Sequence, residues 1–140
     1  LARKREAVRR AIAVNEPDAS DPIGVLAKVG GLEIAGLAGL AIGAAACGVP
    51  LVVDGFISTV AAIAACRIAP GVKPYLIASH LSDEQGHKLA LDVLELAPML
   101  HLAMRLGEGT GAALTFPLID AAKAITEQMA TFESAGVSRA

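Results

Sequence analysis

The fold is decided by Pro50-Leu51-Val52-Val53-Asp54 and by Pro74-Tyr75-Leu76-Ile77-Ala78-Ser79, two apolar runs separated by about twenty residues. In neither run do apolar and polar residues alternate, which is typical of strands buried on both faces of a sheet. Residues 57–66 between them predict a crossover helix. A strand, a helix and a second strand in this order form a right-handed unit with parallel strands. The sequence therefore predicts an α/β fold.

Helices are predicted on either side of this unit. Apolar spacing indicates an amphipathic helix over residues 2–14, and Asp21-Pro22 supplies the N-cap and first-turn proline of a short helix that ends near residue 28. Further helices are expected over residues 32–47, 83–94, 98–104 and 111–130. The last of these is expected to bury a stripe made of Leu114, Leu118, Ala121, Ala122 and Ile125.

The composition argues against two classes of partner. The formal net charge is -2, whereas nucleic-acid-binding domains usually carry a basic face. Residues 34–53 are uncharged and long enough to span a bilayer, but Gly48-Val49-Pro50 divides them, which favours a buried helix followed by a buried strand. The charged start lacks the apolar core of a signal peptide. We expect no nucleic acid, no membrane span and a cytoplasmic location.

Cysteine and histidine spacing gives no indication of a metal site. Cys47 and Cys66 lack CxxC spacing and are expected to be buried free thiols in a reducing compartment. His80, His87 and His101 are scattered rather than clustered. We expect His87 and His101 to lie on helix surfaces, and we predict no metal.

The stretch Gly107-Glu108-Gly109-Thr110-Gly111-Ala112 is the strongest candidate for a functional loop. Glycines on both sides of Glu108 open backbone conformations closed to other residues and remove side-chain bulk, so a ligand can approach the carboxylate closely. The alternative is a glycine-rich loop that simply ends at a helix start, with Thr110 as its N-cap. Spacing alone leaves both interpretations open.

A family resemblance adds to the spacing. The residues Arg105-Leu106-Gly107-Glu108-Gly109-Thr110-Gly111-Ala112 resemble the signature of nicotinate-nucleotide:dimethylbenzimidazole phosphoribosyltransferases, which make the lower-ligand nucleotide of cobalamin. Three other stretches fit the same family in the same order: Val29-Gly30-Gly31-Leu32-Glu33-Ile34-Ala35, Val52-Val53-Asp54-Gly55-Phe56-Ile57-Ser58-Thr59 and Met129-Ala130-Thr131-Phe132. The match runs from about residue 1 to residue 137. Chains of this family are more than twice as long, so the sequence resembles the C-terminal part of such an enzyme.

The resemblance implies transfer of the phosphoribosyl group of nicotinate mononucleotide to 5,6-dimethylbenzimidazole, giving α-ribazole 5′-phosphate and nicotinate. Glu108 is the implied catalytic residue, the general base that takes the N–H proton of the attacking ring. Leu106 can offer that ring an apolar wall, and backbone N–H groups around Gly107 and Gly109 can hold the nicotinate carboxylate or developing charge. This chemistry requires no cofactor, and the expected assembly is a homodimer.

The ends of the two predicted strands supply further candidates. Ligands of open parallel sheets bind beyond the carboxyl ends of the strands, which indicates Asp54-Gly55 and Ser79-His80. Asp54 can hydrogen-bond a ribose hydroxyl or, equally, cap the helix that follows it. Ser58 and Thr59 can donate to a phosphate or to backbone in the first helical turn. The pattern leaves each pair of alternatives open.

Gly30-Gly31 precedes a predicted helix, whose free N–H groups and dipole can bind an anion. Glu33 would oppose a phosphate at that position unless its side chain turns away. The alternative is a plain junction that closes one helix and starts the next.

Two strands alone do not form a stable sheet, which indicates that other strands complete it. The expected fold is the C-terminal part of a doubly wound, Rossmann-like parallel sheet. The resemblance implies that residues 1–20 and 110–140 belong to a small helical subdomain, with residues 21–109 as the α/β segment. The 140 residues alone are expected to be inactive.

Two other classes of function remain open: a non-catalytic nucleotide-binding module, and a subunit that completes the fold of a partner chain.

Overall fold

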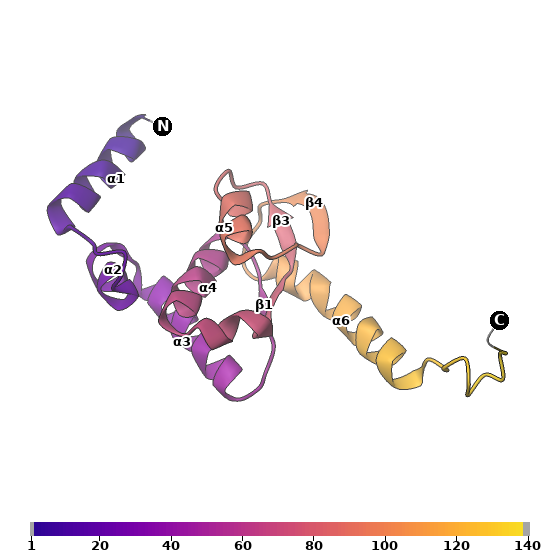
Figure 1. The fold of residues 1–140 in the computed structure, drawn as a ribbon. Helices are drawn as coiled ribbons and strands as arrows, with labels where there is room; N and C mark the ends of the chain where they lie inside the picture. Colours follow the sequence, from indigo (N-terminus) through magenta and orange to yellow (C-terminus); the bar gives the residue numbers. More distant parts are fainter. Residues whose placement is uncertain (1, 139–140) are drawn as a thin grey trace.

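The structure is a computed structural model that describes residues 2–138. Figure 1 shows a central body with two helical arms, of which α1 (Ala2–Asn15) extends from one side and α6 (Thr110–Gln128) from the other. Between the arms follow, in chain order, α2 (Pro22–Val29), α3 (Leu32–Ala46), β1 (Leu51–Val53), α4 (Phe56–Ile68), the 3₁₀ helix η1 (Pro70–Tyr75), β2 (Leu76–Ala78), β3 (His80–Ser82), α5 (His87–Leu94) and β4 (Leu100–Met104).

β1 and β2 form the parallel pair that the two apolar runs predict. The register aligns Leu51 with Leu76 and Val53 with Ala78, and α4 is the connection between the two strands. Branched side chains suit the half-buried, pleated surface of such a pair. The predicted strand–helix–strand unit is therefore confirmed. Both strands are shorter than predicted, and before β2 the residues Pro74 and Tyr75 belong to η1 instead.

The predicted helix over residues 98–104 is wrong, because this segment contains β4, which pairs in parallel with β3. The Leu100 N–H donates to the Ser79 carbonyl at 3.0 Å, a bond that a helix could not make. Ala103 has a φ of 49°, which excludes a regular right-handed helix at this point. Pairing with a distant segment overrides the local helical pattern. The fold is thus a mixed α/β arrangement with two short parallel sheets, joined through Ser79 between β2 and β3.

The core lies among α3, α4 and the first sheet, and alanine is its main component. Ala38 and Ala41 of α3, like Ala62 and Ala65 of α4, are at most 2% exposed. Small side chains let two helix backbones approach closely. In a chain with only 3% aromatic residues, this close approach fills the interior in place of large rings.

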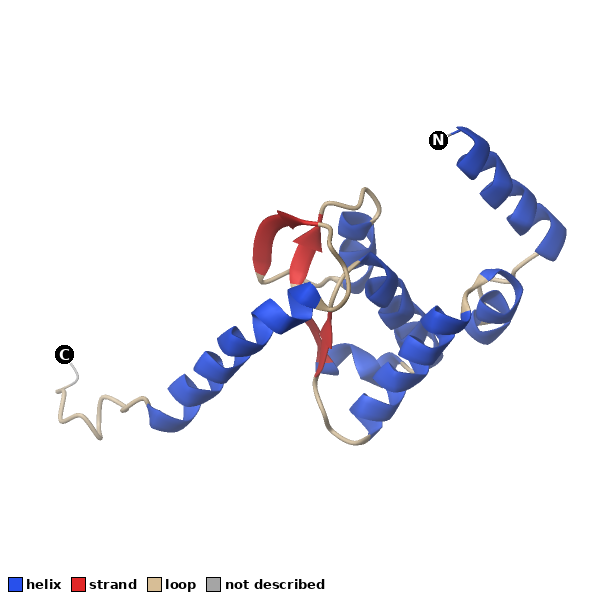
Figure 2. Cartoon of the chain, turned by 180° about the vertical axis from the view of Figure 1, so that it is seen from behind, coloured by secondary structure: helices blue, strands red, loops and turns tan. Residues whose placement is uncertain are grey.

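The two arms project from the body, as Figure 2 shows from behind, and they bury few residues against it. No residue of α1 is buried. The predicted buried stripe of α6 is wrong for this structure, because all five of its members are exposed: Leu114, Leu118, Ala121, Ala122 and Ile125. The buried positions are Gly111 and Thr115, in the first turns, where α6 meets β1, β3 and β4. Beyond these turns α6 leaves the body.

Two smaller expectations also change. Helix α5 begins at His87 rather than near residue 83, because the Ser82 hydroxyl and the Glu84 carbonyl hold a turn between β3 and α5. Cys47, expected to be buried, is exposed at the C-cap of α3. Within residues 2–138, every helix is too short or too polar to cross a bilayer.

Candidate active site

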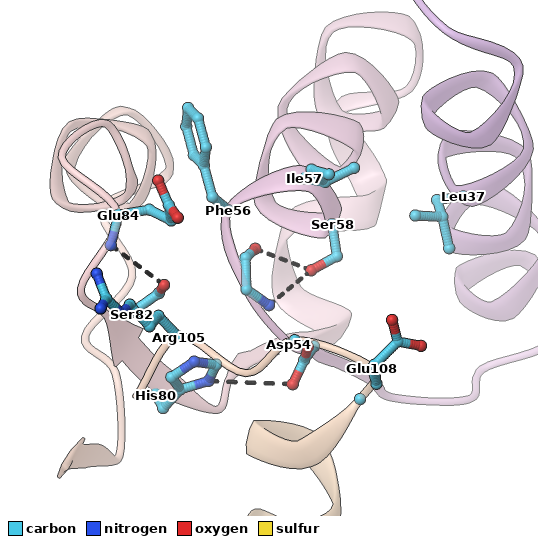
Figure 3. A pocket seen from close by; sticks show the side chains of 13 residues that line it. Leu37, Asp54, Phe56, Ile57, Ser58, His80, Ser82, Glu84, Arg105 and Glu108 are labelled. Atoms are coloured by element: carbon cyan, nitrogen blue, oxygen red, sulfur yellow. Dashed lines mark hydrogen bonds and ion pairs between the residues drawn. The ribbon is translucent and has the colours of Figure 1, made fainter. Parts of the chain in front are cut away.

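A cavity of about 730 Å³ opens at the carboxyl ends of β1 and β2, and Figure 3 looks into it. Four segments form its walls: the turn after β1 with the start of α4, the strand β3 with the loop after it, the glycine-rich loop before α6, and α3 through Leu37. The lining residues used below are Asp54, Gly55, Phe56, Ser58, His80, Ser82, Glu84, Arg105, Gly107, Glu108 and Gly109. The fold thus brings Glu108 to the same cavity as Asp54, Gly55 and Ser58, from which it is separated by about fifty residues of chain.

The loop that carries Glu108 runs through three consecutive residues with left-handed backbone. The φ angle is 79° at Gly107, 57° at Glu108 and 76° at Gly109. Glycine adopts such angles freely, whereas a residue with a side chain does so at a cost on the order of 1–3 kcal/mol. Gly109 is the N-cap of α6, and the Thr110 hydroxyl instead donates to the Gly107 carbonyl at 2.7 Å. The interpretation of Thr110 as N-cap is therefore wrong.

Asp54 holds the start of α6 in place. Its Oδ1 accepts the N–H of Ala112, in the first turn of that helix, at 2.9 Å. A carboxylate at a helix N-terminus satisfies a free N–H group and interacts favourably with the helix dipole. The capping alternative for Asp54 thus applies to a helix 58 residues further along the chain rather than to α4, which follows Asp54 directly. Through this bond the end of β1 fixes the helix that the Glu108 loop leads into.

Gly111 lets α6 approach the cavity wall. A Cβ atom at this position would lie 1.9 Å from Nδ1 of His80, far closer than any real contact. The His80 ring itself is buried, with 3% of the residue exposed. Only glycine at position 111 therefore allows the helix to start against this ring.

The hydroxyls at the start of α4 bond to backbone. Ser58 Oγ accepts the Gly55 N–H and donates to the Gly55 carbonyl, both at 2.9 Å. The Thr59 hydroxyl donates to the same carbonyl at 2.8 Å. Of the two alternatives for these residues, the structure shows the bonds to backbone. Ser58 also lines the cavity, whereas Thr59 is fully buried beneath it.

Two buried histidines adjoin the cavity, His80 in its lining and His87 behind it, and each is bonded to a hydroxyl that donates to the turn after β1. The Ser79 hydroxyl donates to the Asp54 carbonyl at 2.8 Å and lies 3.0 Å from His80 Nδ1. The Thr59 hydroxyl, which donates to the Gly55 carbonyl, lies 2.9 Å from His87 Nε2. Two consecutive carbonyls are thereby held by parallel histidine–hydroxyl pairs. Ser79 itself does not line the cavity. It bonds to the backbone of Asp54, which does.

The surface position expected for His87 is wrong, because this residue is completely buried. The Ser82 N–H donates to His87 Nδ1 at 2.9 Å, so the proton of the neutral ring sits on Nε2. Burial, assisted by the nearby His80 and opposed by Asp54, lowers the pKa of His87. A sequence signal for this burial exists: the spacing of His87 from Ala90, Leu91 and Leu94 is that of one helix face, and all four are buried.

The other predicted site residues lie away from the cavity. Gly31 is the N-cap of α3, and the carboxylate of Glu33 folds back over it, since a Cβ at Gly31 would lie 2.6 Å from Glu33 Oε1. Neither Gly30 nor Gly31 lines the cavity. Leu106 belongs to the loop, but it is 75% exposed and does not face the cavity either. In residues 2–138, no three His, Cys, Asp or Glu side chains gather as a metal site would require.

Comparison with known proteins identifies the family. Residues 1–137 match the family model described as phosphoribosyltransferase. A nicotinate-nucleotide–dimethylbenzimidazole phosphoribosyltransferase from Geobacter sulfurreducens is 56% identical over 138 residues, which cover 99% of this chain and 39% of the relative. The enzyme of that name from Desulforudis audaxviator is 56% identical over 140 residues, with 40% of the relative covered.

A solved structure shares the fold. The crystal structure of nicotinate-nucleotide–dimethylbenzimidazole phosphoribosyltransferase from Thermus thermophilus superposes with a TM-score of 0.91 at 48% identity, over 99% of this chain and 42% of that one. The chain therefore spans about two fifths of the length of the relatives it matches. The match to the family model and to these relatives extends over nearly every residue of the chain. The chain therefore belongs to the nicotinate-nucleotide–dimethylbenzimidazole phosphoribosyltransferase family.

Proposed function

We propose that the complete protein carrying residues 1–140 transfers the phosphoribosyl group of nicotinate mononucleotide to 5,6-dimethylbenzimidazole. The products are α-ribazole 5′-phosphate and nicotinate, in the synthesis of the lower ligand of cobalamin. One observation carries the proposal: Glu108 lines a cavity at the carboxyl ends of parallel strands, in a left-handed loop whose glycines at 107 and 109 leave no side chain on either side of the carboxylate. The relatives named for this reaction support it.

The reaction needs a base and little else from this loop. The pyridinium ring of nicotinate mononucleotide leaves the anomeric carbon of the ribose with the electron pair of the broken C–N bond. A benzimidazole nitrogen forms the new C–N bond from the opposite face, which inverts the configuration from β to α. The second ring nitrogen loses its proton, and Glu108 accepts it. Positioned proton transfer of this kind is typically worth about 10²–10⁴ in rate.

The remaining cavity groups are proposed to bind rather than react. Backbone N–H groups around Gly107 and Gly109 suit the nicotinate carboxylate. The side of the cavity closest to the strand ends is formed by Asp54, Gly55 and Ser58. Ser79 supports this side through its hydrogen bond to the Asp54 carbonyl. Gly30, Gly31 and Leu106 lie outside the cavity of the described residues, so a contact from them to substrate requires the rest of the protein to extend the site.

We also propose the setting of this segment in the complete protein. The two short sheets would join further strands of a doubly wound parallel sheet, since pairs of three- and five-residue strands are too small to be stable alone. The exposed apolar faces of α1 and α6 would pack in a small helical subdomain and in a homodimer. A cytoplasmic location fits the free, exposed Cys47 thiol.

The test is Glu108→Gln in the complete protein, with nicotinate release as the assay. Glutamine keeps the size of the side chain and removes the base, so we expect turnover to fall by about 10² or more with little change in nucleotide binding. Glu84 is the matched control, because it is a second carboxylate that lines the same cavity. A greater loss in Glu84→Gln than in Glu108→Gln would move the role of base to Glu84. Near-normal turnover in both variants would refute the proposed mechanism.

A further inference from the structure

His80 is the one imidazole of the described residues that lines the cavity. It is the first residue of β3, and only 3% of it is exposed. Figure 3 shows its ring between the side chains of Asp54 and Arg105. A titratable side chain buried to this degree is normally bonded at both ring nitrogens. His80 is bonded at one.

The hydrogen bonds around Ser79 decide which nitrogen carries the proton. The Ser79 hydroxyl donates its single proton to the Asp54 carbonyl, because a carbonyl can only accept. Its contact with His80 Nδ1 at 3.0 Å therefore requires the ring nitrogen to donate. Asp54 Oδ1, at 4.0 Å from Nδ1, favours a proton on the same side. In the neutral ring Nε2 is then unprotonated and is a hydrogen-bond acceptor.

Nε2 is reached from the cavity. No group of residues 2–138 bonds to it, and every side-chain nitrogen or oxygen that is cut off from solvent in this part of the chain has a partner. Nε2 is consequently not fully cut off from solvent, and the solvent-filled space that His80 lines is the cavity. The opposite side of the ring is closed by the backbone of Gly111, where a Cβ would meet Nδ1. The His87 ring packs edge-on against His80 with centroids 6.0 Å apart, which holds the ring in this orientation.

We propose that His80 is a substrate-binding residue whose Nε2 accepts a hydrogen bond from a ribose hydroxyl of the nucleotide. The inference rests on the proposed function and follows from the donors that its substrates offer. The benzimidazole has one N–H, which is assigned to Glu108, and the nicotinate carboxylate and phosphate are acceptors. Only the two ribose hydroxyls remain as donors for an unprotonated nitrogen.

Two variants separate the bonds of the two ring nitrogens. In His80→Asn the side-chain amide lies near the former Nδ1 and can still donate to Ser79, but nothing replaces Nε2. In His80→Gln the amide reaches the former Nε2 and its oxygen can accept from the substrate. We expect kcat/KM for nicotinate mononucleotide to fall about three- to tenfold in His80→Asn, with partial recovery in His80→Gln.

Nucleotide analogues identify the contacted group in the complete protein. With either the 2′-deoxy or the 3′-deoxy analogue of nicotinate mononucleotide, wild type and His80→Asn should become equal in kcat/KM, because the contact is then absent from both. The other analogue should preserve the difference between the two proteins. A His80→Asn deficit that persists in full with both analogues would overturn the proposal.

A binding measurement distinguishes failure of this inference from failure of the proposed function. In protein labelled with ¹⁵N-histidine, the His80 signals are those missing from His80→Asn. Saturating nicotinate mononucleotide should shift an unprotonated Nε2, and nicotinate alone should not. Nicotinate release without this shift, or a ring protonated on both nitrogens in the complex, refutes the role of His80 alone. The shift without nicotinate release refutes the proposed transfer and leaves the ribose contact standing.

Discussion

The body and the arms of this molecule contain similar residues and bury them very differently. In the body, α3 and α4 pack on alanines such as Ala38 and Ala65, which are 1% and 0% exposed. In the arms, Ile12 of α1 and Phe116 of α6 are 51% and 53% exposed. An apolar helix face thus finds its partner within the chain in one region and finds none in the other.

The difference shows what a hydrophobic pattern does and does not specify. Periodic apolar residues indicate that a helix face will be covered, but they carry no information on which segment covers it. In the body, α3 and α4 cover each other's alanine faces within the chain. The arms present more exposed apolar side chains than the scattered ones of a monomer would explain, which agrees with a chain that matches about two fifths of its relatives' length.

The largest effect expected from this comparison concerns the 140 residues expressed alone. Exposed apolar arms and the open edges of two short sheets drive association, and half of a substrate cleft cannot position a heterocycle for Glu108. We expect no phosphoribosyl transfer and an associated species in size-exclusion chromatography. The double variant Leu114→Ser/Phe116→Ser should reduce the association. Robust turnover by a monodisperse monomer would show that the arms need no further partner.

A smaller effect is expected where α6 joins the body. In the complete protein, Gly111→Ala forces a Cβ into the His80 ring, which should lower the free energy of unfolding by about 1–3 kcal/mol and reduce turnover. The matched control is Gly39→Ala in α3, where a Cβ has nothing within 4 Å. Alanine there should stabilise the helix by about 0.5–1 kcal/mol. Urea denaturation of both variants measures the contrast, and equal destabilisation would mean that another segment covers α3 as well.

The smallest effect is a change of stability with pH, and it arises from His87 in the body. The pKa of His87 is lowered in the folded protein, first by burial, so the unfolded chain binds its proton more readily. The stabilising contribution is complete above the unfolded pKa of about 6.5 and declines as the pH falls towards the folded value. We expect the urea midpoint to decrease from about pH 7.5 to about pH 5.5, and less so in His87→Asn.

The control for this measurement is His101→Asn, since His101 is exposed on β4. It should retain the full decrease of wild type. If His87→Asn and wild type lose the same stability on acidification, another group governs the acid response of the body.

Local sequence patterns predicted the parts of the structure that depend on near neighbours. The two apolar runs indicated β1, α4 and β2, because burial on both faces leaves a continuous apolar signature. The glycines around Glu108 indicated a loop open to a ligand. In β4, by contrast, residues 101–103 are exposed and Ala103 is left-handed, so no strand pattern was present to be recognised.

Contacts between distant segments lay outside the reach of these patterns. Asp54 was recognised as a cap or a ligand contact, but nothing near it in the sequence indicates the Ala112 N–H as its partner. The bond from Ser79 to the Asp54 carbonyl and the contact of Thr59 with His87 depend on how the segments after β2 and in α5 fold back onto the turn after β1. The burial of His87 agrees with its helical spacing from Ala90, Leu91 and Leu94, whereas its polarity favours a surface position.

The left-handed backbone at Glu108 sets stability and activity against each other at a single position. Glycine would occupy a φ of 57° without the penalty that glutamate incurs. A screen of this loop for heat resistance would therefore enrich glycine at position 108 and, with it, proteins that have lost the proposed base. Selection for growth that depends on the product would retain glutamate in the same library. The residue at this position thus records which of the two pressures has acted on the chain.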